Sequence, residues 1–517
     1  MKKMALEIAE ITTILKEHHL LKQIVNNVEG DHQKITGVKY DSRRAGANDL
    51  FFCKGNFKPA YLEYAQSQGA TVYIAEQLYD NVPAMCGIIV SNVSKAMALI
   101  GAAYYGYPQN DLFIIAFTGT KGKTTSAYYA HNILKETTED KTALFSTIDR
   151  IVGPKPEQQF KSDLTTPESL NLFHDMREAV DSGMHTLVME VSSQAYLRNR
   201  VYGLHYDVGV FLNISPDHIG RNEHPTFENY LHCKLQLLVN SEVCVINAET
   251  DHFEEIYQAA RATTDPEKIY LYKKSAAKLA EEVPIDFTFH NDRDDLQVDE
   301  IELKSHTKKA KTLQIDGRYV LSMPGGYNQS NATAALITVG VAGVTYEQAH
   351  DLLSQVKVPG RMESIQSKKH GVIYVDYAHN YASMNALLSF LRSQYPKGRL
   401  IVVVGSPGDK GISRRKGFGK ALTDHADIAI LTADDPGFED PADIIEEIDS
   451  YVDHQKVQVE KVVDRYEAIK RAILLSHPED VVILAAKGED PYQKVKGVDT
   501  PWPTDTVVAK EVLKGLA

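Results

Sequence analysis

Cysteine, tryptophan and long apolar runs are scarce in this sequence of 517 residues, which has four cysteines and one tryptophan. The cysteines form no C-x-x-C pair and no His/Cys cluster, which argues against a structural zinc site and a disulfide framework. No run approaches the roughly 20 apolar residues of a membrane span. Glu7 and Glu10 interrupt the apolar core that a signal peptide needs. We therefore expect a soluble cytoplasmic protein that does not interact with membranes.

Positive charge is also in short supply. Lys and Arg number 56 against 69 Asp and Glu, which gives a net charge of −13. A general nucleic-acid binder presents a basic face instead, so we expect no nucleic-acid partner. A local basic pocket for a phosphorylated ligand stays compatible with this balance. The 43% hydrophobic content argues against disorder, and at roughly 150 residues per domain the length predicts about three domains.

Strand-like apolar runs alternate with helical stretches almost throughout the chain, as in α/β domains with mostly parallel sheets. We predict a small α/β N-terminal domain over residues 1–108 and a central domain over residues 109–357. The central parallel sheet receives an antiparallel addition from residues 285–323. Residues 358–517 are predicted to form a Rossmann-like C-terminal domain.

The strongest single feature is a glycine-rich loop, TGTKGKTT, at residues 118–125. It follows a buried-strand run and precedes a helix-compatible stretch, where backbone N–H groups and the helix N-terminus can cradle phosphates. Lys123 would reach the β- and γ-phosphates of ATP, and the Thr124 hydroxyl would bind Mg²⁺. Phe117 stands where the general P-loop motif has its first glycine, so this is a shorter GTxGK[ST] form. The predicted ATP-binding residues of the loop are Thr118, Gly119, Thr120, Lys121, Gly122, Lys123 and Thr124.

This shorter loop resembles that of the Mur ligases and of their relative folylpolyglutamate synthase. Further motifs follow in the order of the Mur ligase family, from residue 41 to residue 488. They are DSR at 41–43, DLTTP at 163–167, MEVSSQA at 189–195, NISPDH at 213–218, GGYN at 325–328, PGRME at 359–363 and DYAH at 376–379. The sequence is similar to the MurE branch, the tripeptide synthetases, and within it to the lysine-adding type.

The resemblance implies an ATP-dependent amide ligase that forms ADP and phosphate through an acyl-phosphate intermediate. Glu190 ends a predicted buried strand, where an unpaired carboxylate is costly and Mg²⁺ binding would explain it. The resemblance implies that His218 holds a second Mg²⁺. It also implies that Lys234 is carbamylated by CO₂, which converts a cation into an anionic oxygen ligand. The predicted catalytic residues are Lys123, Lys234, His218 and Glu190, and the predicted metal ligands are Thr124, Glu190, His218 and the carbamate of Lys234.

Other substrate contacts are also implied by the resemblance. Arg361 would reach the γ-phosphate when the third domain closes, Asp376 would bind the ATP ribose, and Asn331 would lie on the adenine side. We expect domain closure because ATP-site motifs lie in both the second and the third domain. The residues expected to bind the UDP-linked muramoyl-dipeptide are Ser42, Thr165, Thr166, Ser192 and Arg200.

The incoming amino acid is predicted from residues 434–437, DDPG. Diaminopimelate-adding members carry DNPR, whose arginine pairs with the distal carboxylate of that substrate. Gly437 offers no guanidinium, and a buried unpaired carboxylate costs on the order of 1–3 kcal/mol. Acidic groups in the matching loops suit a cationic side chain: Asp435, Glu439, Glu489 and Asp490. The predicted amino-acid site is Asp434, Asp435, Pro436, Gly437 and Asp490, with L-lysine as substrate and L-ornithine or D-lysine as alternatives.

The resemblance thus implies a ligase that adds L-lysine to UDP-N-acetylmuramoyl-L-alanyl-D-glutamate in peptidoglycan precursor synthesis, and we expect it to be a monomer. Folylpolyglutamate synthase shares the loop and the three-domain plan, but the DSR, TTP and MEVSS segments argue against it. A P-loop kinase or nucleotide-regulated switch would not need Arg361 and Asp376 on a separate domain. A binding module without catalysis is a further alternative, and amino-acid-dependent ATP turnover would exclude it.

Overall fold

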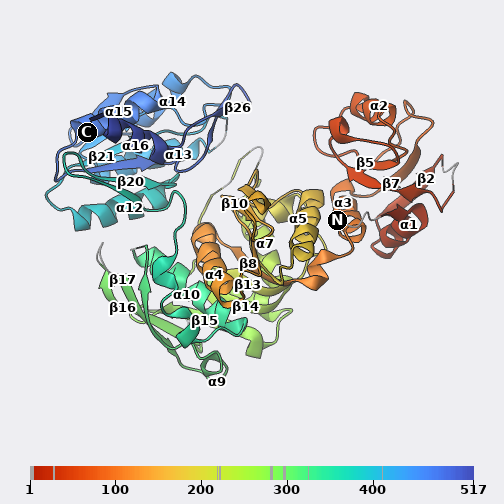
Figure 1. Ribbon diagram of the computed structural model, residues 1–517, viewed down its shortest axis with the longest axis horizontal. Coiled ribbons are helices and arrows are strands. Elements are labelled where there is room, and N and C mark those ends of the chain that lie inside the picture. The colour runs from red at the N-terminus through yellow and green to blue at the C-terminus, as the bar shows by residue number, and fades with distance from the viewer. Residues whose placement is uncertain are drawn as a thin grey trace. The chain divides into compact units, whose positions relative to one another are not determined.

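The computed structural model describes most of the chain (Figure 1), namely residues 5–26, 30–217, 219–220, 223–279, 283–294, 299–323, 325–409 and 411–516. Contacts divide it into two compact units, and most of the second unit is the range Lys357–Ala517. Three larger sheets, of five, eleven and six strands, confirm the predicted three-domain α/β architecture. The domain boundaries at residues 108 and 357 stay predictions.

The first sheet has the order β2-β7-β6-β5-β4, and all neighbours are parallel except β2 and β7. Its strands carry apolar residues on both faces, because helices cover both: Phe52 packs in one core and Phe51 in the other. The strands, with the two of a small additional sheet, are β1 Leu6–Glu7, β2 Leu21–Val25, β3 Lys34–Ile35, β4 Gly37–Lys39, β5 Asp49–Phe52, β6 Val72–Ala75 and β7 Cys86–Val90. The helices are α1 Ile8–Glu17, η1 Ser42–Arg44, α2 Pro59–Ser67 and α3 Val93–Tyr104.

The central sheet has the order β11-β10-β9-β12-β8-β13-β14-β15-β16-β17-β18. Strands β9, β12, β8, β13, β14, β15 and β16 run parallel, whereas β10 pairs antiparallel with β9 and β11. The predicted addition from residues 285–323 joins this sheet as β16, β17 and β18, but its first strand, β16, pairs parallel with β15, whereas the sequence predicts an antiparallel addition. The carboxyl ends of β9, β12, β8 and β13 therefore meet at one edge, where ligands of α/β proteins bind.

The elements of this domain have the following bounds. The strands are β8 Phe113–Thr118, β9 Thr142–Phe145, β10 Asp149–Ile151, β11 Gln159–Lys161, β12 Thr186–Glu190, β13 Tyr206–Phe211, β14 Ser241–Asn247, β15 Ile269–Lys274, β16 Phe287–Asp294, β17 Asp299–Ser305 and β18 Gly317–Leu321. The helices are η2 Pro108–Asp111, α4 Lys123–Thr137, η3 Pro156–Gln158, α5 Ser169–Asp181, α6 Ser193–Leu197, α7 Phe227–Val239, α8 Phe253–Arg261, η4 Pro266–Lys268, α9 Lys308–Lys311, α10 Gly326–Val341, α11 Tyr346–Ala349 and η5 Leu353–Gln355.

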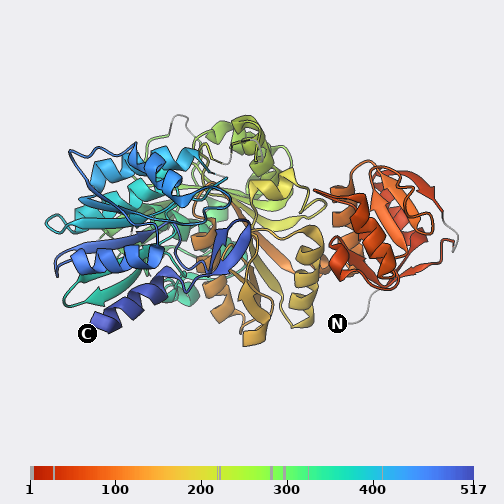
Figure 2. The same cartoon turned by 90° about the horizontal axis from the view of Figure 1, so that it is seen from above.

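The third sheet has the order β19-β20-β24-β21-β22-β23, and all neighbours are parallel except β19 and β20. Its two faces carry separate apolar cores, and helices lie on both sides of it (Figure 2), so this domain is Rossmann-like as predicted. Its strands, with a separate hairpin, are β19 Glu363–Ser367, β20 Gly371–Asp376, β21 Leu400–Val404, β22 Ile428–Leu431, β23 Gln458–Lys461, β24 Val481–Ala485, β25 Tyr492–Val495 and β26 Val498–Pro501. Its helices are α12 Tyr381–Gln394, α13 Ser413–His425, α14 Pro441–Asp449, α15 Arg465–Leu475 and α16 Asp505–Leu516.

Two expectations from composition can be compared with this fold. The four cysteines all lie in the described part of the chain, where they are buried and form no disulfide. None of the helices described has both the length and the apolar character that crossing a membrane requires.

Candidate functional site

The glycine-rich loop joins β8 to α4, in the strand–loop–helix context that was predicted. Gly122 has a φ of 84°, and a Cβ there would lie 2.2 Å from Oδ1 of Asn331 on α10. Only glycine therefore fits at this position. The backbone oxygen of Asn331 also accepts a hydrogen bond from Oγ of Ser126 at 3.2 Å. Asn331 thus lies directly against the loop at the start of α4.

Two lysines converge on one carbonyl oxygen of the loop. Nζ of Lys123 donates to the oxygen of Gly119 at 2.9 Å, and Nζ of Lys234, from α7, donates to the same oxygen at 2.7 Å. Lys234 is 2% exposed and its Nζ lies 4.8 Å from the centre of the Tyr230 ring. Burial and the nearby positive charge of Lys123 hold the pKa of Lys234 well below its usual range. The sequence-predicted pair is therefore assembled, with Lys234 favoured in its uncharged form.

Glu190, at the end of β12, is fully buried beside the loop. Its Oε1 accepts hydrogen bonds from Oγ1 of Thr124 at 2.9 Å and from the backbone N–H of Thr147 at 2.7 Å. Its Oε2 accepts from Oγ1 of Thr147 at 3.1 Å. A buried carboxylate beside a hydroxyl provides the oxygen ligands that Mg²⁺ prefers, so these residues fit the predicted metal site.

Thr147 is a site residue that the sequence analysis missed. It follows β9, which pairs with β12, so the carboxyl ends of these parallel strands place it next to Glu190. No strand was predicted over Thr142–Phe145, so a hydroxyl residue just beyond that segment carried no signal until the strand order was known.

The NISPDH segment holds the loop from the side of β13. Oδ1 of Asn213 accepts from the backbone N–H of Lys121 at 2.9 Å, and Nδ2 of Asn213 donates to the oxygen of Lys121 at 3.1 Å. Burial lowers the pKa of the Lys121 side chain to about 8. His218, the predicted ligand of a second Mg²⁺, lies outside the described residues.

The residues predicted to bind the muramoyl-dipeptide converge next to Glu190. Oγ1 of Thr166 donates to the backbone oxygen of Glu190 at 3.1 Å and accepts from the backbone N–H of Ser192 at 3.0 Å. Nη1 of Arg200 donates to the oxygen of Thr166 at 3.3 Å, and the hydroxyls of Thr165 and Thr147 lie 3.0 Å apart. These four predicted residues form one polar surface beside the loop. Ser42 lies apart from it in the first domain, buried at the start of η1.

Asp376, at the end of β20 in the second unit, is buried and engaged with the backbone. Its Oδ2 accepts from the N–H of Met362 at 2.9 Å, and its Oδ1 accepts from the N–H of Ala378 at 2.8 Å. Burial raises the pKa of Asp376 even though the nearby Arg361 opposes the shift. The Arg361 guanidinium lies 5.1 Å from the centre of the Tyr377 ring. Asp376 therefore shapes the turn that carries Arg361, and its contact with ribose stays a prediction.

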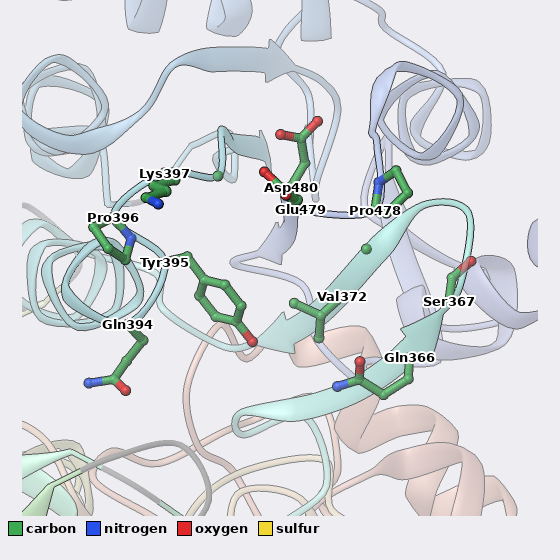
Figure 3. Close-up of a pocket in the computed structure, with 12 residues that line it drawn as sticks. Gln366, Ser367, Val372, Gln394, Tyr395, Pro396, Lys397, Pro478, Glu479 and Asp480 are labelled. Carbon is green, nitrogen blue, oxygen red and sulfur yellow. The ribbon is translucent and has the colours of Figure 1, made fainter.

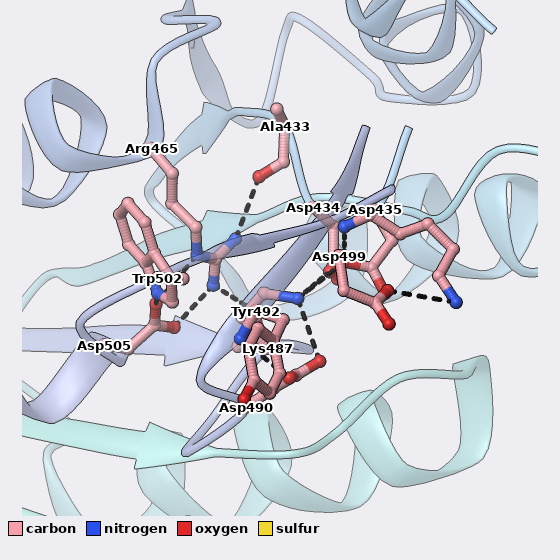
Figure 4. A network of polar contacts seen from close by, with 12 residues as sticks. Ala433, Asp434, Asp435, Arg465, Lys487, Asp490, Tyr492, Asp499, Trp502 and Asp505 are labelled. Carbon is pink, nitrogen blue, oxygen red and sulfur yellow. Dashed lines mark hydrogen bonds and ion pairs between the residues drawn. The ribbon is translucent and has the colours of Figure 1, made fainter. Parts of the chain in front are cut away.

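The acidic residues of the predicted amino-acid site surround a lysine that the sequence analysis missed (Figure 4). Nζ of Lys487 lies 3.4 Å from Oδ1 of Asp434, 2.6 Å from Oδ1 of Asp435 and 3.0 Å from Oδ2 of Asp490. These carboxylates raise the pKa of Lys487 above its usual value, against the opposing effect of burial. Three carboxylates on one ammonium group leave a surplus of negative charge, which can still attract a second cation.

The other acidic loop residues differ from one another. Glu439 accepts from Nη2 of Arg415 at 2.9 Å, so an internal cation already pairs with it. Oε1 of Glu489 is buried and has no hydrogen-bond partner among the described residues. Pro436 belongs to the same turn, because the N–H of Glu439 donates to its oxygen at 3.0 Å.

Asp505 is the first residue of α16 and forms an ion pair with Arg465 (Figure 4). Its Oδ1 accepts from Nε of Arg465 at 2.8 Å, and its Oδ2 accepts from Nη2 at 2.5 Å. Nε1 of Trp502, the single tryptophan, donates to Asp505 Oδ1 at 3.3 Å. Both charged side chains are fully buried, and Nη1 of Arg465 donates to the oxygen of Ala433 at 3.3 Å. This pair ties α15 and α16 to the DDPG segment.

Gly437 adopts the left-handed region, with φ at 61°, and a Cβ there would lie 2.4 Å from Oδ2 of Asp409. That oxygen accepts from the backbone N–H of Phe438 at 2.8 Å. We expect Gly437→Ala to lower the free energy of unfolding by about 1 kcal/mol or more, because strain and a close contact add together. Thermal denaturation measures the effect.

A double variant separates the two causes. If the contact with Asp409 contributes, Gly437→Ala costs less stability when Asp409→Ala is already present than it does alone. Equal costs in the two backgrounds would show that backbone strain alone acts at Gly437.

A cavity of about 380 Å³ in the second unit lies away from the predicted site (Figure 3). It is found where β20, β21 and β24 begin, and Val372, Tyr395, Lys397 and Asp480 are among the residues that line it. Asp376 is instead the last residue of β20, and the DDPG segment follows the carboxyl end of β22. The cavity is therefore no part of the site that the sequence predicts.

Comparisons with known proteins point to one family. The model of the Mur ligase middle domain matches residues 117–339, and that of the Mur ligase glutamate ligase domain matches residues 360–488. A UDP-N-acetylmuramyl-tripeptide synthetase from Ligilactobacillus salivarius is 60% identical, and the alignment covers 99% of this chain and 100% of the relative. A UDP-N-acetylmuramoyl-L-alanyl-D-glutamate–L-lysine ligase from Enterococcus faecalis is 45% identical, with 98% of this chain and 99% of the relative covered.

Solved structures share the fold. A UDP-N-acetylmuramoyl-L-alanyl-D-glutamate–2,6-diaminopimelate ligase superposes with a TM-score of 0.64 over 99% of both chains at 24% identity. A MurF ligase from Thermotoga maritima in complex with ADP gives a TM-score of 0.57 at 18% identity, with 92% of this chain and 96% of that chain covered.

Proposed function

The chain belongs to the Mur ligase family, and from this premise we propose that it joins L-lysine to UDP-N-acetylmuramoyl-L-alanyl-D-glutamate. Members of this family are ATP-dependent amide ligases, and the chain is one. The observation that carries the proposal is the surface beside the phosphate loop, where Thr124 and Glu190 adjoin Thr166 and Arg200. We further propose that it acts in the cytoplasm as a monomer.

The phosphate loop would bind ATP, with Lys123 at the β- and γ-phosphates. The donors next to it fit Mg²⁺, because Oγ1 of Thr124 and the carboxylate of Glu190 are buried side by side. His218 and the carbamate of Lys234 complete the proposed ligand set. Mg²⁺, when bound, neutralises phosphate charge in the reaction.

The reaction would run in two steps. The γ-phosphoryl group of ATP passes to the γ-carboxylate of the D-glutamyl residue, which gives an acyl phosphate and ADP. The α-amine of L-lysine then attacks the acyl carbon, an amide bond forms, and inorganic phosphate leaves. The protein would position the reactants and neutralise their charge. Lys123 and Arg361 would contact phosphate groups, and Arg200 and Thr166 would bind the peptide.

Two observations support lysine over diaminopimelate. Gly437 supplies no guanidinium for a second carboxylate, and Asp409 occupies the space that a side chain there would take. Three carboxylates surround the single ammonium group of Lys487, and their excess negative charge favours an amino acid with a cationic end. L-Ornithine, which is shorter, and D-lysine are the alternatives.

A parallel ligation assay tests the substrate. UDP-N-acetylmuramoyl-L-alanyl-D-glutamate and ATP are supplied with L-lysine, D-lysine, L-ornithine or meso-diaminopimelate, and tripeptide formation is measured. We expect kcat/KM for L-lysine to exceed that for diaminopimelate by at least about 100-fold, because a buried carboxylate without a partner is rejected strongly. Equal or better incorporation of diaminopimelate would contradict the lysine proposal. A reaction without amino acid is the control for uncoupled ATP hydrolysis.

A further inference from the structure

Glu168 connects the first domain to the peptide end of the proposed site. It directly precedes α5 and follows the TTP segment at residues 165–167. One oxygen of its carboxylate, Oε2, pairs with Nζ of Lys54, and the other, Oε1, accepts from Nε of Arg200 at 3.0 Å. The side chains of Lys54 and Glu168 are each 18% exposed and that of Arg200 is 14% exposed. One carboxylate is therefore shared by two cations that come from different domains.

Tyr40 makes a second connection between the first domain and α5. Tyr40 comes directly after β4 and precedes the DSR turn at residues 41–43. Its ring centre lies 5.0 Å from Nζ of Lys54, and its hydroxyl accepts from Nδ2 of Asn171 on α5 at 3.3 Å. The edge of the first sheet that leads into Ser42 is thus joined to α5 by both Tyr40 and Lys54.

The charges favour an ionised and ordered Glu168. Burial works to raise the pKa of Glu168, but Lys54 and Arg200 together bring it below its usual value. The N-terminus of α5 favours a negative charge at the same place. Nη1 of Arg200 also donates to the oxygen of Thr166. Because a guanidinium is planar, these two contacts determine where the rest of the Arg200 head points.

We propose that Glu168 is a positioning residue that orients Arg200 toward the anionic peptide end of the UDP-linked substrate. Through Lys54 it also couples that end to the part of the first domain that carries Ser42. The inference rests on the proposed function, in which Arg200 and Ser42 bind opposite ends of the same nucleotide-peptide. It assigns to Glu168 an effect on this substrate that ATP and the amino acid do not share.

Glu168→Gln tests the proposal, because it keeps the shape of the side chain and removes its charge. We expect KM for UDP-N-acetylmuramoyl-L-alanyl-D-glutamate to rise by about tenfold or more, as charge-assisted hydrogen bonds are lost. KM for ATP and for L-lysine should stay within about twofold, since only the contacts of Glu168 with Arg200 and Lys54 are disturbed. Lys54→Met should shift the same KM in the same direction, and Glu168→Asp should restore part of the affinity.

Lys95→Met is the matched control. Nζ of Lys95, on α3, lies 4.8 Å from the centre of the Tyr202 ring, so Lys95, like Lys54, is a lysine of the first domain that packs on a tyrosine and contacts the central domain. It has no contact with Glu168 in the described structure, and we expect all three KM values to be unchanged.

The outcomes separate the two levels of the proposal. Failure of the unaltered enzyme to ligate L-lysine to the dipeptide substrate would contradict the proposed function itself. Normal ligation with an unchanged nucleotide-peptide KM in Glu168→Gln would overturn only the role of Glu168. A parallel rise in all three KM values would also overturn it, in favour of a structural role. Titration calorimetry with UDP-N-acetylmuramoyl-L-alanine, which lacks D-glutamate, should show equal affinity for both enzymes, and a matching loss would overturn the assignment to the peptide end.

Discussion

Lys123→Met is expected to lower ligase turnover by about 10²–10³-fold or more, because it removes the cation that would contact the β- and γ-phosphates of ATP. Lys123 is the first residue of α4, and its Nζ lies 2.9 Å from the backbone oxygen of Gly119 in the loop. A phosphoryl group in transfer develops charge on its oxygens, and an ammonium group already in place stabilises that charge without reorganisation. Formation of ADP, with all three substrates at saturation, measures the effect.

The control for this variant lies on the same helix. Lys135 belongs to the last turn of α4, is half-exposed and pairs with Asp140 at 3.5 Å. Exposed pairs of this kind contribute little, so Lys135→Met should turn over at the normal rate. A near-normal rate for Lys123→Met would contradict the role assigned to the loop lysine.

The phosphate loop could be predicted from the sequence because its geometry is local. A buried strand, a glycine that tolerates positive φ and a helix start lie within a few residues of one another, and the structure has them in that order. The alternation of strands and helices likewise sufficed for three α/β domains. Residues such as Glu190 were found because they end predicted strands, and parallel strands bring their carboxyl ends to one edge.

The partners of these residues could not be predicted, because they come from elsewhere in the chain. Thr147 reaches Glu190 only through the order β9-β12-β8, which no local pattern specifies. The acidic residues of the DDPG segment were recognised as a charge pattern, but the buried Lys487 among them was not. Similarly, Arg200 was predicted as a binding residue without Glu168, whose carboxylate orients it.

Lys234→Met is expected to lower turnover by about 10²–10³-fold, and the structure gives a chemical reason. The side chain is buried against Tyr230, and its Nζ lies 2.7 Å from the same oxygen of Gly119 that Lys123 contacts. Only an uncharged amine reacts with CO₂, which forms an N–C bond and releases a proton to give the carbamate. Burial and Lys123 favour the uncharged amine by lowering the pKa of Lys234.

Two further measurements distinguish a carbamate from a simple cation at Lys234. Enzyme prepared without CO₂ should regain turnover when bicarbonate is added, whereas Lys234→Met should not respond. Protonation of the buried amine opposes folding, so stability that depends on Lys234 rises with pH from the lowered pKa toward the ordinary value of about 10.4. Lys234→Met removes that dependence and should unfold at the same temperature or higher at neutral pH, so its loss of turnover cannot come from unfolding. A normal rate for Lys234→Met, or a bicarbonate response that this variant shares, would contradict the proposed carbamate.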